Sequence, residues 1–301
     1  MSFARPSASV SSMQVGLHAL GIGDGARPEI VRAVAEAAEA HGFARLWSGE
    51  HVVLVDAPAS RYPYSADGRI AVPVDADWLD PFLTLSFAAA VTTTIGLATG
   101  VLLLPEHNPV VVAKQAATLD VLSGGRLTLG IGVGWSAEEF AALGVPFAHR
   151  GRRTAEYVAA MRTLWANDVA SFDGEFVRFD AIRVNPKPAR GRRIPVVVGG
   201  NSDAALRRVA TLGDGWYGFN LPAAAVAERV TALAAECARQ GRSPAEPTVA
   251  VALSDGSPDL LSDLAEIGVT ELVVVEAPPA TPEAATRWVA DLADRWITPG
   301  R

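Results

Sequence analysis

The chain is poor in the residue types that hold disulfides and metal ions. Its 301 residues include one cysteine and five histidines, with no HExxH motif, no GxSxG motif and no paired Cys/His ligand set. A disulfide within the chain is therefore excluded, and zinc or serine-hydrolase chemistry has no support. We expect no metal site. The cysteine, Cys237, lies in an alanine-rich helical pattern, which predicts a buried and inert thiol.

Long apolar runs and basic clusters are also missing. No stretch is long and apolar enough to span a membrane, and residues 1–12 lack the apolar run of a secretory signal. The net charge is −7 and the basic residues are dispersed, which argues against nucleic acid as a partner. We therefore expect a cytoplasmic protein without a membrane or nucleic-acid partner, in which residues 1–12 form a flexible tail.

What the chain does contain is a regular alternation of short β-rich runs and amphipathic helices. The predicted strands cover residues 13–20, 45–48, 95–103, 127–133, 195–198, 215–219, 249–253 and 271–275. The predicted helices cover residues 28–41, 80–92, 108–122, 149–166, 202–211, 222–240, 259–267 and 282–296. Eight strands that alternate with eight helices predict a single α/β domain over residues 13–301, a closed (β/α)8 TIM barrel. A doubly wound open sheet is the alternative.

Two longer segments interrupt this alternation. Residues 50–79 follow the second strand and are rich in Pro, Asp and Tyr. They leave from the carboxyl end of a strand, the face where barrel enzymes keep their active sites, so we predict that they form a lid over the substrate. Residues 168–188, before the fifth strand, contain two β-like runs around Asp173-Gly174, which predicts an inserted hairpin.

The run Val198-Gly199-Gly200-Asn201-Ser202 joins the fifth strand to a helix. Two glycines let the backbone approach a ligand closely, and the helix start behind them offers free N–H groups and a positive dipole end. This pattern predicts a phosphate site. The alternative is a tight turn in which Asn201 or Ser202 merely caps the helix.

A second glycine-rich run, Gly130-Ile131-Gly132-Val133-Gly134-Trp135, ends the fourth strand. It is not a dinucleotide fingerprint, because a GxGxxG of that kind must lead directly into a helix and be followed by an acidic residue. The alternate glycines face one side of the strand. They either keep space for a bulky flat ligand or fit a crowded barrel interior.

Polar residues also follow the second and third strands. Thr99-Gly100 ends the third strand, and Glu106-His107-Asn108 lies in the loop beyond it, where Asn108 before Pro109 is expected to cap a helix. His51 follows Glu50 at the tip of the second strand. A histidine there can give or accept a proton near neutral pH, or it can simply hydrogen-bond its own loop.

These stretches, in this order, resemble the luciferase-like monooxygenase superfamily and look most like its actinobacterial branch that uses the deazaflavin coenzyme F420. The stretches that carry the resemblance are 46–51, 96–101 with 108–109, 116–120 with 123–126, 130–135 with 138–140, and 198–200 with 213–216. The resemblance runs from Met13 to about Phe219 and weakly beyond.

The resemblance implies a (β/α)8 barrel, usually dimeric, with a flavin-type ring across the barrel mouth. It also implies a non-prolyl cis peptide at Gly100-Val101 behind the ring, the cofactor phosphate at Gly199-Gly200, and His51 beside the reactive carbon. The cofactor-binding candidates are Thr99, Gly100, Val101, Asn108, Gly132, Gly134, Trp135, Gly199, Gly200 and Asn201, and the catalytic candidates are His51 and Glu50.

The function that the resemblance implies is a coenzyme F420-dependent oxidoreductase, a homodimer that transfers a hydride between the deazaflavin and a small organic substrate. The alternatives are an FMN-dependent luciferase-like monooxygenase and, from another class, a non-catalytic flavin-binding protein. The chain departs from the sugar-phosphate-using relatives at Val55, where they have a tryptophan, and at Trp135, where they have a carboxylate. A sugar-phosphate substrate is therefore not expected.

Overall fold

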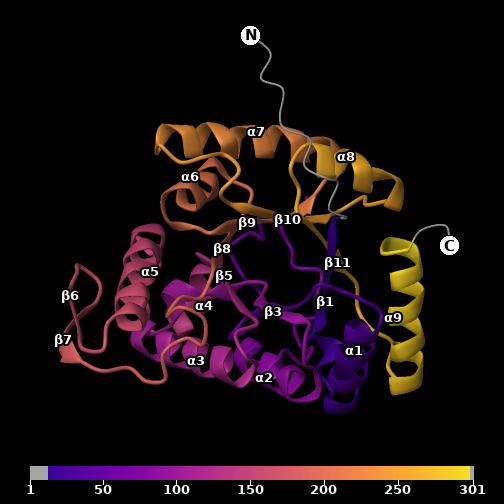
Figure 1. Ribbon diagram of the computed structural model, residues 1–301, viewed down its shortest axis with the longest axis horizontal. Helices are drawn as coiled ribbons and strands as arrows, with labels where there is room; N and C mark the ends of the chain where they lie inside the picture. Colours follow the sequence, from indigo (N-terminus) through magenta and orange to yellow (C-terminus); the bar gives the residue numbers. More distant parts are fainter. Residues whose placement is uncertain (1–12, 299–301) are drawn as a thin grey trace, which may run out of the picture.

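The computed structural model of the protein describes residues 13–298. The predicted tail, residues 1–12, lies outside the described residues, as do residues 299–301. Within the described range, eight parallel strands form a closed barrel that helices surround (Figure 1). The predicted TIM barrel is confirmed, and the open-sheet alternative is excluded.

The strands follow one another around the barrel in chain order. They are β1 (Gln14–Leu20), β2 (Arg45–Ser48), β3 (Gly96–Thr99) continued by β4 (Leu102–Leu103), β5 (Leu127–Gly132), β8 (Val196–Gly199), β9 (Gly215–Leu221), β10 (Thr248–Leu253) and β11 (Glu271–Val275). Parallel pairing of β3 with β5 and of β1 with β11 completes the ring. The predicted third strand is interrupted at Gly100–Val101, whose peptide bond is cis as the resemblance implied.

The helices that cover the barrel begin and end close to their predicted bounds. They are α1 (Pro28–Ala40), α2 (Pro81–Val91), α3 (Pro109–Leu122), α5 (Arg150–Ala166), α6 (Asp203–Leu212), α7 (Ala223–Arg239), α8 (Leu261–Glu266) and α9 (Pro282–Trp296). Short 3-10 turns occur as η1 (Gly23–Ala26), η2 (Leu104–Glu106) and η3 (Pro258–Leu260), and the predicted helix 259–267 is divided between η3 and α8. Side-chain oxygens cap the first turns of four of these covering helices, from Asp80, Asn108, Ser202 and Thr281.

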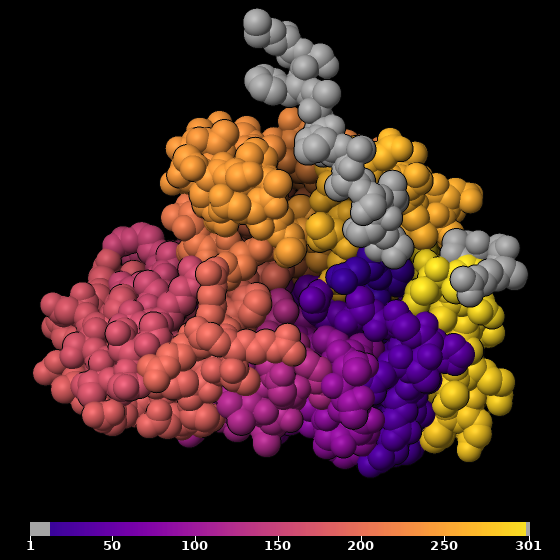
Figure 2. All heavy atoms as spheres, in the orientation of Figure 1, coloured from indigo at the N-terminus to yellow at the C-terminus, as the bar shows by residue number. Residues whose placement is uncertain are grey.

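Two further elements lie outside the regular alternation. The predicted hairpin is present as antiparallel β6 (Ala170–Asp173) and β7 (Arg178–Ile182), at the left edge of the molecule in Figures 1 and 2. The alternation does not predict the short helix α4 (Ala137–Ala142). Its signal is a capping box, in which the Ser136 hydroxyl accepts a hydrogen bond from the Glu139 N–H at 3.2 Å.

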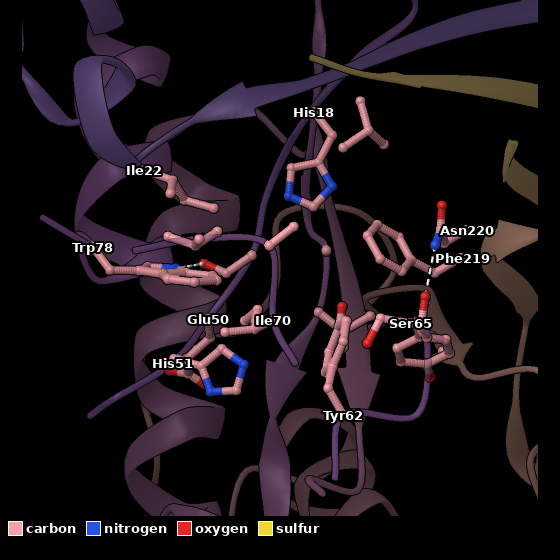
Figure 3. Close-up of a pocket in the computed structure, with 18 of the residues that line it drawn as sticks. His18, Ile22, Glu50, His51, Tyr62, Ser65, Ile70, Trp78, Phe219 and Asn220 are labelled. Carbon is pink, nitrogen blue, oxygen red and sulfur yellow. Dashed lines mark hydrogen bonds between the residues drawn. The ribbon is translucent and has the colours of Figure 1, made fainter. Parts of the chain in front are cut away.

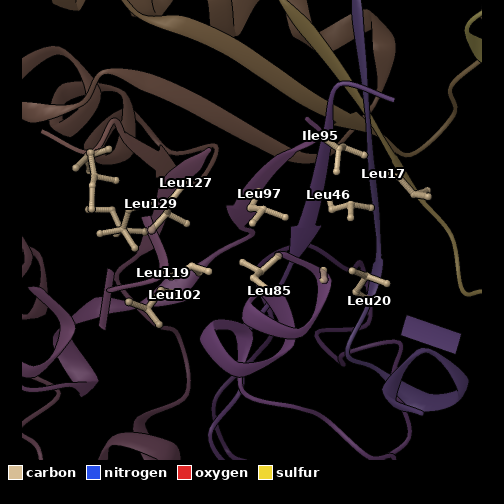
Figure 4. Close-up of a cluster of buried hydrophobic side chains, with 14 of the residues drawn as sticks. Leu17, Leu20, Leu46, Leu85, Ile95, Leu97, Leu102, Leu119, Leu127 and Leu129 are labelled. Atoms are coloured by element: carbon tan, nitrogen blue, oxygen red, sulfur yellow. The ribbon is translucent and has the colours of Figure 1, made fainter. Parts of the chain in front are cut away.

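Side chains on the barrel strands alternate between an outer and an inner core. Leu46 belongs to the outer core, between strands and helices (Figure 4), and its neighbour Trp47 belongs to the inner one. Inside, Trp47 stacks on Tyr217 with ring centroids 4.6 Å apart. The Trp47 indole N–H donates to the carboxylate of Glu271 at 2.8 Å, and Arg45 pairs with the same carboxylate. Since this network fills the amino-terminal end of the barrel, a ligand cavity has room only at the carboxyl end.

The packing of the barrel wall can be tested by a substitution at Gly130. A Cβ atom on Gly130 would overlap the carbonyl oxygen of Thr99. We expect Gly130→Ala to lower the free energy of unfolding by about 3 kcal/mol, at the upper end for overpacking, measured by urea denaturation of the apo-protein. The control is Gly42→Ala, where φ is +83° and no atom lies within 4 Å of the added methyl group. This change should cost about 1 kcal/mol. Equal stability of the two variants would show that the wall is not crowded.

Candidate active site

A cavity of about 510 Å³ opens at the carboxyl end of the barrel strands (Figure 3). Strand ends supply its floor, which includes His18 and Val101. The 50–79 loop supplies Tyr62 and Trp78, among other lining residues. The predicted lid therefore lies over the barrel mouth, and the volume is in the range that small-molecule sites have.

The structure brings seven of the twelve candidate residues to this cavity. They are Glu50, His51, Gly100, Val101, Trp135, Gly199 and Gly200. The other five, Thr99, Asn108, Gly132, Gly134 and Asn201, are not among the residues that line it.

Three of these five hold main-chain groups. The Thr99 hydroxyl donates to a carbonyl oxygen of β5 at 2.6 Å. Asn108 accepts from the N–H of Val110 at 2.9 Å and caps α3, as the Asn-Pro pattern predicts. The Asn201 side chain grips Phe219 twice, donating to its carbonyl oxygen at 2.7 Å and accepting from its N–H at 3.1 Å. These contacts position the walls of the site. Cofactor binding by the three residues stays a prediction.

Gly132 and Gly199 form a seat for Val101. A Cβ on Gly132 would stand 2.7 Å from one Val101 methyl carbon, and a Cβ on Gly199 would stand 2.8 Å from the other. Val101 is thus fixed between β5 and β8, with its side chain against the cavity. At Gly134, where φ is +74°, a Cβ would meet the Phe140 ring. The space beside these glycines is filled by protein atoms, which supports the crowded-interior interpretation.

His51 is held in one orientation at the cavity wall. Its Nδ1 lies 2.8 Å from a carboxylate oxygen of Glu139, and because an ionised carboxylate only accepts, Nδ1 carries the hydrogen. Nε2 then has a lone pair, which accepts a hydrogen bond from the indole N–H of Trp135 at 3.4 Å. The Trp78 ring meets His51 edge-on, with centroids 5.0 Å apart. His51 therefore bonds to α4 and to the end of β5, and not simply to its own loop.

Both carboxylate oxygens of Glu50 have hydrogen-bond partners. Its carboxylate accepts from the N–H of Leu103 at 2.6 Å and from Nε2 of His107 at 3.0 Å. Burial lowers the pKa of His107, but the hydrogen bond and the charge of Glu50 outweigh it, so the pKa is raised overall. Glu50 ties the end of β2 to η2, and a catalytic role for it stays a prediction.

Two neighbouring carboxylates of α4 anchor the first part of the loop. Glu139 accepts from the N–H groups of residues 52 and 53, at 2.7 and 3.2 Å. Glu138 accepts from the N–H groups of residues 59 and 60, at 2.7 and 3.0 Å. Sequence reasoning did not assign Glu139 a role, although its place in the capping box marks it.

His18 and Tyr217 form a neutral polar pair in the cavity floor, and neither was among the site candidates. The His18 Nδ1 lies 3.2 Å from the Tyr217 hydroxyl. Burial lowers the pKa of His18 to about 4 and raises the pKa of Tyr217, so both groups are uncharged at neutral pH. Strand alternation, which turns both side chains inward, is the signal that could have found them.

Glu106 is a buried carboxyl group beside the site. Neither of its oxygens has a hydrogen-bond partner among the residues that the structure describes, and the residue is 7% exposed. Burial, and then the charges of Glu139 and Glu50, raise its pKa from 4.5 to about 9. Glu106 is therefore protonated and neutral at pH 7.

Two structural absences apply to residues 13–298. No group of three or more His, Cys, Asp or Glu side chains there could hold a metal ion. No helix in this range has the length and apolar character needed to cross a membrane.

Comparisons with known proteins concern the family and the fold. A family model described as luciferase-like monooxygenase matches residues 5–254. The uncharacterized protein Rv0953c of Mycobacterium tuberculosis is 37% identical over 263 residues, which cover 87% of this chain and 92% of that protein. An FMNH2-dependent dimethylsulfone monooxygenase of Pseudomonas putida is 33% identical over 155 residues, 50% of this chain and 42% of that one. The coenzyme F420-dependent tetrahydromethanopterin reductase of Methanopyrus kandleri has the same fold, with a TM-score of 0.74 at 17% identity over 97% of this chain and 100% of that one.

The proton on Glu106 makes stability depend on pH. Because the native pKa of about 9 lies above the ordinary 4.5, the native state keeps a proton that the unfolded chain releases, and stability falls as pH rises between these values. In Glu106→Gln this dependence is absent. We expect the difference in the free energy of unfolding, variant minus wild type, to rise by about 1 kcal/mol or more from pH 5.5 to pH 8.5, measured by urea denaturation. Parallel pH profiles for the two proteins would contradict the assignment.

Proposed function

We propose a function from one premise: the chain belongs to the luciferase-like monooxygenase family. Members of this family are monooxygenases and F420-dependent oxidoreductases, and the chain is an oxidoreductase. Within that class we assign it to the coenzyme F420-dependent enzymes, which transfer a hydride between the deazaflavin and a small organic substrate. The observation that carries this assignment is the His51–Glu139 pair at the cavity wall, because it supplies the proton handling that a hydride transfer to or from a substrate needs.

The residues at the barrel mouth fit a flavin-type group. Val101, held in its glycine seat, offers a rigid apolar surface for a flat ring. Beyond it, the backbone N–H groups of residues 201–203 have no acceptor among the described residues. Ser202 caps α6, so the capping alternative also holds, but capping leaves these donors free for a phosphate. The carboxylate of Asp203 pairs with Arg229 at 2.9 Å, which offsets its charge beside that site.

A bound deazaflavin supplies two-electron hydride transfer, whereas FMN also permits oxygen activation. The task of the chain is to orient the reactants, exclude water and move a proton. In our proposal the substrate under the 50–79 loop takes the place of the Trp135 indole N–H at Nε2 of His51. His51, with its hydrogen on Nδ1, then accepts a proton at Nε2 from the substrate, or returns one. Glu139 stabilises the imidazolium that forms when Nε2 is protonated.

An FMN-dependent monooxygenase is the second candidate. It is favoured by the 33% identity with an FMNH2-dependent monooxygenase. Both functions use the same barrel mouth and the same glycine turn. The homodimer and the cytoplasmic location stay predictions. Leu83 on α2 and Leu122 on α3 are large apolar side chains that the single chain leaves exposed.

Binding of each cofactor to the apo-protein tests the assignment. We expect F420 to bind at least about tenfold more tightly than FMN, measured by equilibrium dialysis with fluorescence detection. Preferential binding of FMN would move the function to the second candidate. Binding of neither cofactor would overturn both.

Replacement of His51 tests the proton-transfer role. We expect His51→Ala to lower turnover about 100-fold or more, the usual scale for an acid–base group, with cofactor affinity largely kept. His41→Ala, at the exposed end of α1, is the matched control and should leave turnover unchanged. Unchanged turnover in His51→Ala would remove His51 from the mechanism.

A further inference from the structure

Asn201, Phe219, Asn220 and Tyr64 form a chain of contacts, here called the latch, from the glycine turn to the loop. Asn201 grips the main chain of Phe219 from both sides. The next residue, Asn220, has a left-handed backbone with φ of +51° and donates its side-chain amide to the carbonyl oxygen of Tyr64 at 2.7 Å (Figure 3). The rings of Tyr64 and Phe219 pack edge-on, with centroids 5.5 Å apart.

The side-chain hydroxyl of Tyr64, at the far end of the latch, lies beside the glycine turn where the latch begins. The hydroxyl oxygen lies 3.5 Å from the position that a Cβ of Gly200 would take, so it stands over the bare turn. Tyr64 accepts the hydrogen bond of Asn220 at its main-chain carbonyl oxygen. Its side-chain hydroxyl has no hydrogen-bond partner among the described residues. Burial raises the pKa of this phenol, so the hydroxyl keeps its hydrogen and remains a donor near neutral pH.

We propose that Tyr64 donates a hydrogen bond to the phosphate of the bound cofactor, so that the 50–79 loop closes on the cofactor as well as on the substrate. This inference rests on the proposed function, which puts a phosphate at Gly199-Gly200. The N–H of Gly200 is already used by the carbonyl oxygen of Tyr217, at 3.2 Å. The loop therefore adds a donor above a turn that cannot use this N–H for the phosphate. A bond to a charged phosphate oxygen is stronger than one between neutral groups.

The first test compares cofactors with and without the phosphate. The pairs are FMN with riboflavin, and F420 with its phosphate-free deazariboflavin. We expect Tyr64→Phe to weaken binding of the phosphate-bearing member by about tenfold or more and to leave the phosphate-free member within about twofold. Tyr157→Phe is the matched control: it removes a tyrosine hydroxyl on α5, away from the residues that line the cavity, and should leave both affinities within about twofold.

The second test follows the loop itself. Arg61 and Arg69 flank the loop tip and are exposed, so trypsin can cut after both. We expect FMN or F420 to slow cleavage at these sites several-fold in the wild type, and the phosphate-free compounds to slow it less. Tyr64→Phe should remove that difference. Asn220→Gly should also remove it, because glycine accepts the positive φ while the amide donor to the loop is lost.

The outcomes separate this inference from the proposed function. If FMN binds more tightly than F420 and Tyr64→Phe still weakens binding of the phosphate-bearing compounds alone, the role of Tyr64 stands and the cofactor assignment changes. An unchanged preference for the phosphate-bearing compound in Tyr64→Phe would overturn the latch. An equal loss in Tyr157→Phe would also overturn it, because the loss of a tyrosine hydroxyl would then act through the fold and not through the phosphate.

Discussion

A single buried carboxylate, Glu139, joins the parts on which the site depends. It is 1% exposed, and its two oxygens accept from His51 and from two backbone N–H groups at the start of the loop. An ionised group in such a place is stable only when donors surround it. The orientation of His51 and the course of the loop therefore have the same cause. The short helix α4 places this carboxylate beside His51 and the start of the loop.

Glu139 and the acidic side chains near it are each either hydrogen-bonded to a histidine or protonated. His51 donates to Glu139, and His107 donates to Glu50. Glu106, which has no such partner among residues 13–298, keeps its proton instead. Three acidic groups can thus share one side of the barrel mouth, because Glu106 is neutral at pH 7. The cavity floor beside them, with His18 and Tyr217, remains neutral.

The fold could be predicted from the sequence because its signals are local. Strand and helix periods lie within short windows, and helix starts such as Asn108-Pro109 are marked by adjacent residues. The site could be predicted only where a motif marks a strand end, as at His51 and Gly199-Gly200. The contacts that complete it join distant segments. Tyr64 and Asn220 are 156 positions apart in the sequence, and His18 and Tyr217 are 199 apart.

Asn201 is a residue that a sequence motif locates without indicating its hydrogen-bond partner. The turn motif marks it as a cofactor ligand, but its amide is occupied by the main chain of Phe219. Nothing in the spacing of residues 198–202 indicates that a strand following in the sequence would use this side chain. A motif thus locates a turn between a strand and a helix, while the partner of each side chain in it depends on packing between elements.

Hydrogen bonds fasten the loop that covers the cavity near both of its ends. Glu138 and Glu139 hold its first part, and the N–H of Leu79 donates to the carbonyl oxygen of Gly21 at 2.8 Å at its end. Residues 61–72, which lie between these fastenings, provide much of the cavity cover. The hydrophobic core clusters of the described residues include none of residues 61–72. The contacts that hold the barrel together are thus separate from those that cover its mouth.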